Sequence, residues 1–156
     1  MKKLFLALPL ALAAGSVFAA DPIEKQVLIT ATVPTASFFV EPVGGNWMND
    51  PQNMAWNPHM ETLSPIRKQL EAKSTVGPIT AHLLTPAVVT SGGNSIDLNV
   101  KVGNFDLTTS PVEILSDAQA NAGAIVDFVV TAVKPAAGYT PGNYQGLVNM
   151  MFETTL

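Results

Sequence analysis

Residues 95–107 read S-I-D-L-N-V-K-V-G-N-F-D-L, and this stretch decides the fold class. Apolar residues occupy every second position from Ile96 to Val102, and polar residues occupy the positions between them. This period of two places one row of side chains in a core and the other in solvent, as in a half-buried β-strand. Gly103-Asn104 is a turn signal, so the stretch predicts two antiparallel strands of a hairpin.

Similar short apolar or alternating stretches recur along the chain, separated by turn signals. Twelve prolines are spread along the sequence and interrupt any long helical pattern. Residues 124–133 are largely apolar on both faces and predict a central strand, whereas residues 118–122 are small and polar and predict a loop. Residues 65–72 fit either a short helix or a strand. The other expected strands are residues 37–40, 54–58, 77–84, 86–89, 111–115 and 144–155.

Residues 1–19 have the three parts of a secretory signal peptide. A short basic start is followed by an apolar run of about 11 residues, and Val17 and Ala19 provide the small residues of a cleavage site after Ala19. A membrane anchor is the alternative, but this run is shorter than the roughly 20 residues that span a bilayer. The sequence therefore predicts export and removal of residues 1–19.

Removing 19 of the 156 residues leaves 137, which is the size of one domain. The series of short strands predicts that this domain is all-β, a β-sandwich with a small barrel as the alternative. The mature chain keeps six basic and twelve acidic residues, because two of the eight basic residues are Lys2 and Lys3. This acidic balance argues against a nucleic-acid partner, which attracts clustered Lys and Arg.

Residue types that carry chemistry are sparse. The chain has no cysteine, which excludes disulfides, thiol catalysis and cysteine-ligated metals. His59 and His82 are too far apart to supply two local metal ligands, and both are expected at the surface. Glu113 and Asp117 are four residues apart without a helical pattern, so a catalytic carboxylate pair could form only by tertiary contact. The sequence predicts no metal, no cofactor and no enzymatic activity.

Trp47 and Trp56 flank an amide-rich segment, residues 49–53. Indole rings stack on sugar rings, so one hypothesis is a self-contained, secreted carbohydrate-binding module that uses the Trp47–Trp56 loop. The competing interpretation is that both tryptophans pack in the core or at a subunit contact.

Residues 23–33, I-E-K-Q-V-L-I-T-A-T-V, form a long alternating stretch close to the mature N-terminus. Val27, Ile29 and Val33 share one face with Ala31, and Pro34 ends the pattern because proline cannot donate to a β-ladder. A strand at a chain end needs a partner to be ordered. The pattern alone allows that partner to be the chain's own sandwich or another molecule.

The two chain ends also resemble a known family. Residues 23–33 resemble the mature N-terminus of the major subunits of CS1-type fimbriae, the group that includes colonization factor antigen I. Residues 141–152, P-G-N-Y-Q-G-L-V-N-M-M-F, are similar to the closing strand of that family, with its G-N-Y-x-G-x-V core. The absence of cysteine also suits this family. Two departures are the extra residues 20–22 and the position of Pro34 directly after Val33.

The resemblance implies an immunoglobulin-like β-sandwich that lacks its last strand and is completed by donor-strand exchange. It divides the chain into a signal peptide (1–19), a donor-strand extension (20–34) and a pilin sandwich (35–156). It implies head-to-tail polymerisation of the chain with itself in a cell-surface fimbria, with a periplasmic chaperone, an outer-membrane usher and a minor tip adhesin as partners. The implied donor residues are Ile23, Val27, Ile29, Ala31 and Val33. The implied acceptor and chaperone-contacting residues are Tyr144, Gly146, Leu147, Val148, Met150 and Phe152.

Overall fold

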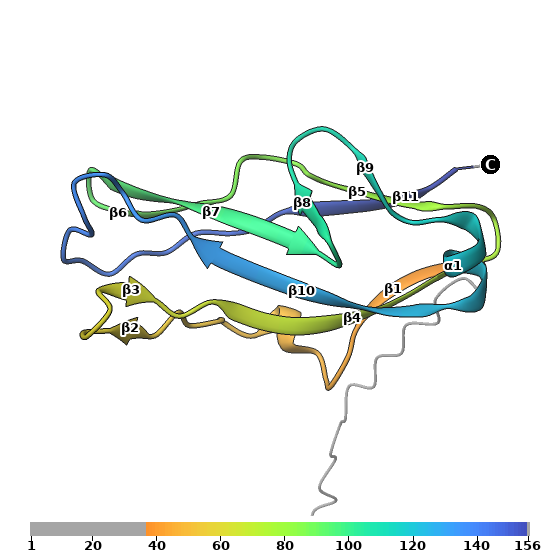
Figure 1. Ribbon diagram of the computed structural model, residues 1–156, viewed down its shortest axis with the longest axis horizontal. Helices are drawn as coiled ribbons and strands as arrows, with labels where there is room; N and C mark the ends of the chain where they lie inside the picture. Colours follow the sequence, from red (N-terminus) through yellow and green to blue (C-terminus); the bar gives the residue numbers. More distant parts are fainter. Residues whose placement is uncertain (1–36, 156) are drawn as a thin grey trace, which may run out of the picture. The chain divides into compact units, whose positions relative to one another are not determined.

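The computed structural model describes residues 37–155, which form antiparallel strands and two short helical segments (Figure 1). Among these residues, no helix is long and apolar enough to cross a membrane. The elements in chain order are β1 (Phe38–Pro42), the 3-10 helix η1 (Trp47–Asn49), β2 (Trp56–Asn57), β3 (Thr62–Leu63), β4 (Ile66–Ser74), β5 (Ile79–Leu83), β6 (Val88–Ser91), β7 (Asn94–Val102), β8 (Phe105–Leu107), β9 (Val112–Leu115), α1 (Asp117–Ala122), β10 (Ala124–Ala132) and β11 (Met150–Thr154).

The strands form two main sheets and one separate hairpin. The larger sheet has the order β1-β4-β10-β7-β6, and β8 also pairs with β7. The smaller sheet has the order β11-β5-β9, and β2 pairs with β3. Buried side chains from both sheets form one core, so the two sheets are the layers of a sandwich. The predicted all-β sandwich is therefore confirmed.

The core lies between the two sheets and follows the alternation of the sequence. Along β7, Ile96, Val100 and Val102 are buried, whereas Ser95, Asp97 and Asn99 are exposed. Each β-strand contributes every second side chain to this layer because successive side chains point to opposite faces. The best-covered members of the core are Leu70, Ala72, Ile79, Ala81, Val100, Val102 and Ala120.

Two predictions for the centre of the larger sheet are confirmed. Residues 95–102 and 105–107 form the β7–β8 hairpin, with Gly103 at a φ of 59° in the turn between them. β10 is a central strand because it pairs with both β4 and β7. Only one face of β10 is buried, however, and Ile125 on the other face is 61% exposed. The ambiguous residues 65–72 are strand, not helix, and belong to β4.

The loop predicted for residues 118–122 is wrong, because residues 117–122 form α1. Ser116 and Gln119 make a capping box at its start, in which the Ser116 amide donates to Gln119 Oε1 at 3.0 Å. Such a pair satisfies amide groups that the first helical turn leaves without partners. The small alanines of this segment favour a short helix once its first turn is capped.

The predicted final strand, residues 144–155, is too long, because β11 covers only Met150–Thr154. Before β11, Gln145 forms an isolated bridge in which it exchanges two backbone hydrogen bonds with Thr90 of β6, and the Asn149 carbonyl accepts one from the Leu84 amide. Two other predicted strands are displaced or shortened. β6 begins at Val88 instead of residue 86, and only residues 56–57 of the predicted 54–58 are strand.

Candidate functional site

Two strands, β1 and β11, each lie at the edge of a sheet. Within residues 37–155, β1 pairs only with β4 and β11 pairs only with β5. The outer edge of β11 therefore presents backbone N–H and C=O groups to which no described strand is paired. An edge of this kind is a template for a further strand. The sandwich is thus open where another strand could add to it.

The side chains of these two edge strands that pack against the core are only half-buried. From residue 148 to residue 154 the exposure alternates, with even-numbered residues half-buried and odd-numbered residues exposed. In β5, which is covered on both edges, the corresponding core residues are fully buried. Some half-buried apolar side chains of the two edge strands, and one just before β11, pack against the core. We call this set the open side. Its members are Phe38, Val40, Val148, Met150 and Phe152.

A partly buried hydroxyl pair ties the end of β11 to the larger sheet. Ser74 Oγ lies 2.7 Å from Thr154 Oγ1, and Thr154 Oγ1 also donates to the Gly77 carbonyl at 3.2 Å. Since the single Thr154 hydroxyl hydrogen is used there, Ser74 is the donor to Thr154. Ser74 is the register partner of Phe38, so β11 lies close to the β1–β4 pair at this end. The Ser74 oxygen also accepts from the amides of Val76 and Gly77.

We expect Ser74→Ala to destabilise the fold by about 1–3 kcal/mol, because it leaves buried polar groups without partners. Ser74 is fully buried, and its hydroxyl has partners in the β4–β5 turn and in β11. Ser95→Ala is the matched control, because Ser95 is exposed on β7. Urea denaturation followed by circular dichroism measures the difference. An equal midpoint for both variants would show that the hydroxyl pair contributes nothing.

The segment before β11 is held against β6 by a close backbone approach. A Cβ atom on Gly146 would collide with the Val88 carbonyl oxygen and lie 3.0 Å from Val89 Cα. The Gln145–Thr90 bridge is adjacent, with hydrogen bonds of 2.9 and 3.0 Å. Only glycine allows this approach, which fixes where the C-terminal segment enters the small sheet.

The structure brings together some of the predicted acceptor residues but not others. Val148, Met150 and Phe152 belong to the open side, whereas Leu147 is 79% exposed. Tyr144 lies outside the core and donates its hydroxyl hydrogen to the Thr140 carbonyl at 2.9 Å. The predicted donor residues Ile23, Val27, Ile29, Ala31 and Val33 lie outside the described residues. Phe38 and Val40 of the open side were not predicted from the sequence. They lie there because β1 is an edge strand among the described residues, and the order of strands in a sheet is not visible in a local pattern.

The two tryptophans have different environments. Trp47 is buried and stacks on Phe128 with ring centroids 5.4 Å apart, so it belongs to the core. Trp56 is 49% exposed and meets Tyr139 edge to face at 5.5 Å. The hypothesis that a loop presents both indoles to a sugar is therefore wrong for Trp47.

The expectation that His82 is a surface residue is confirmed only in part. Its side chain is only 17% exposed, and its Nδ1 atom lies 3.7 Å from Glu153 Oε2 on the neighbouring strand β11. His82 nevertheless lies on the outer face of the small sheet, directly opposite Met151. His59 is exposed in the turn between β2 and β3.

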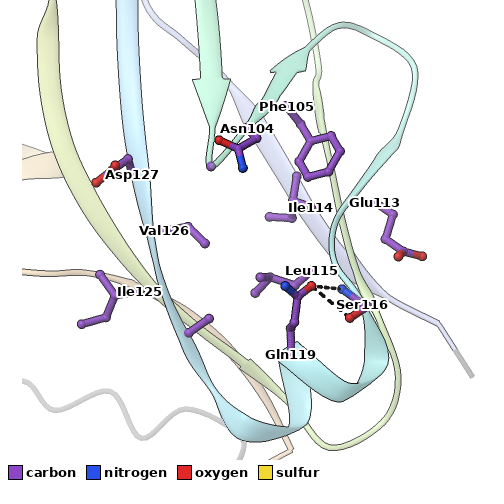
Figure 2. Close-up of a pocket in the computed structure, with 12 residues that line it drawn as sticks. Asn104, Phe105, Glu113, Ile114, Leu115, Ser116, Gln119, Ile125, Val126 and Asp127 are labelled. Carbon is purple, nitrogen blue, oxygen red and sulfur yellow. Dashed lines mark hydrogen bonds between the residues drawn. The ribbon is translucent and has the colours of Figure 1, made fainter.

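A cavity of about 460 Å³ lies between α1, β9, β10 and the β7–β8 turn (Figure 2). Figure 2 shows its two carboxylates, Glu113 and Asp127, on opposite sides, so they do not converge on a common point. Gln119 Oε1 faces Ser116 and accepts hydrogen bonds from it at 2.9 and 3.0 Å. Within residues 37–155, no group of three or more potential metal ligands is found. The open side is therefore the better candidate for the functional site.

Comparison with protein families gives one match that covers most of the chain. The family model described as "CS1 type fimbrial major subunit" matches residues 23–153. The matched region contains all five predicted donor residues and all six predicted acceptor residues. No curated protein sequence gives a significant match.

Comparison with solved structures gives ten significant matches. One of them is the CooA pilin subunit from enterotoxigenic Escherichia coli, with a TM-score of 0.64 and 15% sequence identity. The alignment covers 76% of this chain and 88% of the CooA chain. At this identity the likeness concerns the fold, and it agrees with the sandwich described above.

Proposed function

Because the chain belongs to the family of CS1 type fimbrial major subunits, we propose that it polymerises by donating residues 23–33 to the open side of a neighbouring subunit. Membership of this family makes the chain a structural subunit of a cell-surface fimbria that assembles with copies of itself. The donor-strand mechanism and the residues that carry it are the proposal.

The open side is the observation that carries this proposal. Within residues 37–155, β11 has one edge without a paired strand, and the apolar side chains beside it are only half-buried. An added strand would pair its backbone with β11 and cover Met150 and Phe152 with alternate side chains. This addition would complete the sandwich with the strand that it lacks.

Residues 23–33 have the composition that such a strand needs. Ile23, Val27, Ile29 and Val33 share a face with Ala31 and Lys25, and the opposite face is polar except at Leu28. Burial of each larger apolar side chain contributes about 1.5–3 kcal/mol, so the donor face contributes on the order of 5–10 kcal/mol to each subunit joint. The joint links different surfaces of two copies, and repetition of such a contact without ring closure gives a filament.

The open side also requires protection before assembly. A free subunit exposes an unpaired strand edge and half-buried core residues, so it is expected to be unstable or to aggregate. We propose that a periplasmic chaperone covers this surface after the signal peptide has directed export. An outer-membrane usher then exchanges the chaperone for the next subunit, and a minor tip adhesin begins the fibre, which supports adhesion.

Deletion of residues 20–33 tests the proposal. We expect the full-length chain to run as an SDS-resistant ladder without boiling, and the deleted chain to give no ladder. A synthetic peptide of residues 20–34, added during refolding, should restore a soluble monomer because it fills the open side. A deleted chain that stays a stable, soluble monomer without peptide would contradict the proposal and favour the self-contained carbohydrate-binding sandwich.

A further inference from the structure

A second cavity, of about 340 Å³, lies at the end of the sandwich opposite the start of β1. The β2–β3 hairpin forms part of its wall and lies next to the first residue of β4. β1 begins at the other end of β4, beside its last residue, Ser74. Figure 1 shows the hairpin at the left end and α1 at the right end. Three aromatic rings, two aliphatic side chains and a turn segment line the cavity. They are Trp56, Leu63, Ile96, Tyr139, Thr140, Pro141, Gly142 and Tyr144.

The aromatic walls of this cavity are held in place but incompletely covered. Trp56 is 49% exposed and is fixed edge to face against Tyr139, with ring centroids 5.5 Å apart at 84°. The Tyr144 hydroxyl is fixed by its hydrogen bond to the Thr140 carbonyl. Grooves lined by aromatic side chains are the usual receptors for proline rings, which fit with little loss of conformational freedom.

In a linear fibre, the direction of the donor strand determines which of its ends lies near this cavity. The extension of each subunit precedes Ser37 and therefore leaves at the α1 end of the sandwich. In a head-to-tail fibre, the subunit that donates a strand must then lie beyond the opposite end, beside the β2–β3 hairpin. Its donor strand consequently runs antiparallel to β11, with Val33 at the hairpin end.

The two segments have the same length. Residues 23–33 and residues 144–154 are each 11 residues long, which is at most about 36 Å when extended. If the donor lies along the whole C-terminal segment, Ile23 is opposite Thr154 and Val33 is opposite Tyr144. The next residue of the donor is Pro34, and Tyr144 is part of the cavity wall.

We propose that the cavity of Trp56, Tyr139 and Tyr144 binds Pro34 of the neighbouring subunit. This inference rests on the proposed donor-strand function and adds a second anchor at the subunit joint. Pro34 prevents further β-pairing because it lacks an amide hydrogen, so the donor strand ends at the rim of the acceptor. The aromatic cavity then fixes the direction in which the chain leaves toward its own sandwich.

Cysteine cross-linking in assembled fimbriae tests the contact, because the chain contains no cysteine. A disulfide requires Cα atoms about 4.4–6.8 Å apart. We expect Pro34→Cys combined with Thr140→Cys to give a disulfide-linked ladder that survives boiling without reductant. Pro34→Cys combined with Gln119→Cys is the control, because Gln119 is exposed on α1 at the other end, and it should give no such ladder.

Tryptophan fluorescence tests the role of the proline ring itself. Trp47 is buried in the core, so acrylamide quenches mainly the fluorescence of Trp56. The quenching constants of wild-type and Pro34→Ala fimbriae therefore compare the accessibility of Trp56. We expect at least a twofold greater quenching constant in Pro34→Ala fimbriae, and no such change in fimbriae that carry Pro58→Ala. If wild-type fimbriae form an SDS-resistant ladder but Trp56 stays accessible, the cavity is free for another ligand and the inference is overturned. If the wild-type chain forms no ladder at all, the donor-strand function fails instead.

Discussion

The substitution Ile29→Asp is expected to abolish the SDS-resistant ladder. In the proposed joint, Ile29 lies at the centre of the donor face and covers the open side of the next subunit. The change removes about 2 kcal/mol of apolar burial and places a carboxylate in an apolar site without a partner, which costs several kcal/mol more. The total is comparable with the 5–10 kcal/mol expected for the whole donor face. Unboiled electrophoresis of surface extracts and electron microscopy measure the loss.

Thr30→Asp is the matched control for Ile29→Asp. It introduces the same charge one residue further along the donor segment, where the alternation places the side chain on the opposite face. We expect Thr30→Asp to retain the ladder, although with a lower dissociation temperature. Equal loss in both variants would indicate a general effect on export or folding, and it would contradict the assigned donor face.

The substitution Gly146→Ala is expected to displace the segment that leads into β11. Its Cβ atom would meet the backbone of β6, which cannot move aside as a flexible side chain could. Overpacking of this kind costs about 1–3 kcal/mol. Loss of the two Gln145–Thr90 hydrogen bonds would add about 1 kcal/mol each. The acceptor edge would be weakened together with the fold, so we expect both a lower urea midpoint and fewer SDS-resistant oligomers.

Gly93→Ala separates this steric effect from the general effect of replacing glycine. A Cβ atom on Gly93 has no neighbour within 4 Å, and its backbone is not in the left-handed region. Alanine there should leave stability unchanged or raise it slightly, because it restricts the unfolded chain. The urea midpoints of the two variants give the comparison. A Gly146→Ala midpoint as high as that of Gly93→Ala would show that the close approach does not constrain the segment.

The sequence predicted the β7–β8 hairpin and the central strand β10, because alternation and apolar runs are local properties, but it left β4 open between helix and strand. The period of two at residues 95–102 is enough to assign Ile96, Val100 and Val102 to the core, as the structure confirms. The same periodicity could not locate the ends of the C-terminal strand. Exposure still alternates from Val148 onward, but residues 144–149 lack a continuous strand partner in the described chain. Pairing depends on neighbours that are remote in sequence, so the pattern overestimated the strand.

The helix α1 has a local sequence signal. Ser116 and Gln119 have the spacing of a capping box, and small residues with little strand propensity follow them. The candidate site was predictable only in part, because some of its residues are placed by the order of the strands. Val148, Met150 and Phe152 were expected from a family resemblance, whereas Phe38 and Val40 join the candidate site because β1 is an edge strand within residues 37–155. Strand order is a tertiary property and has no local signature.

The late position of β11 in the chain has a consequence for the order of folding. Phe152 pairs with Ala81, 71 positions earlier, so the small sheet closes one of the longest loops in the molecule. Pairing between such distant segments is slow, because the entropy of closing the loop is lost before the contacts form. The larger sheet is complete 18 residues before β11 begins. Among the described strands, β11 is therefore expected to pair last, when the larger sheet can already serve as its scaffold.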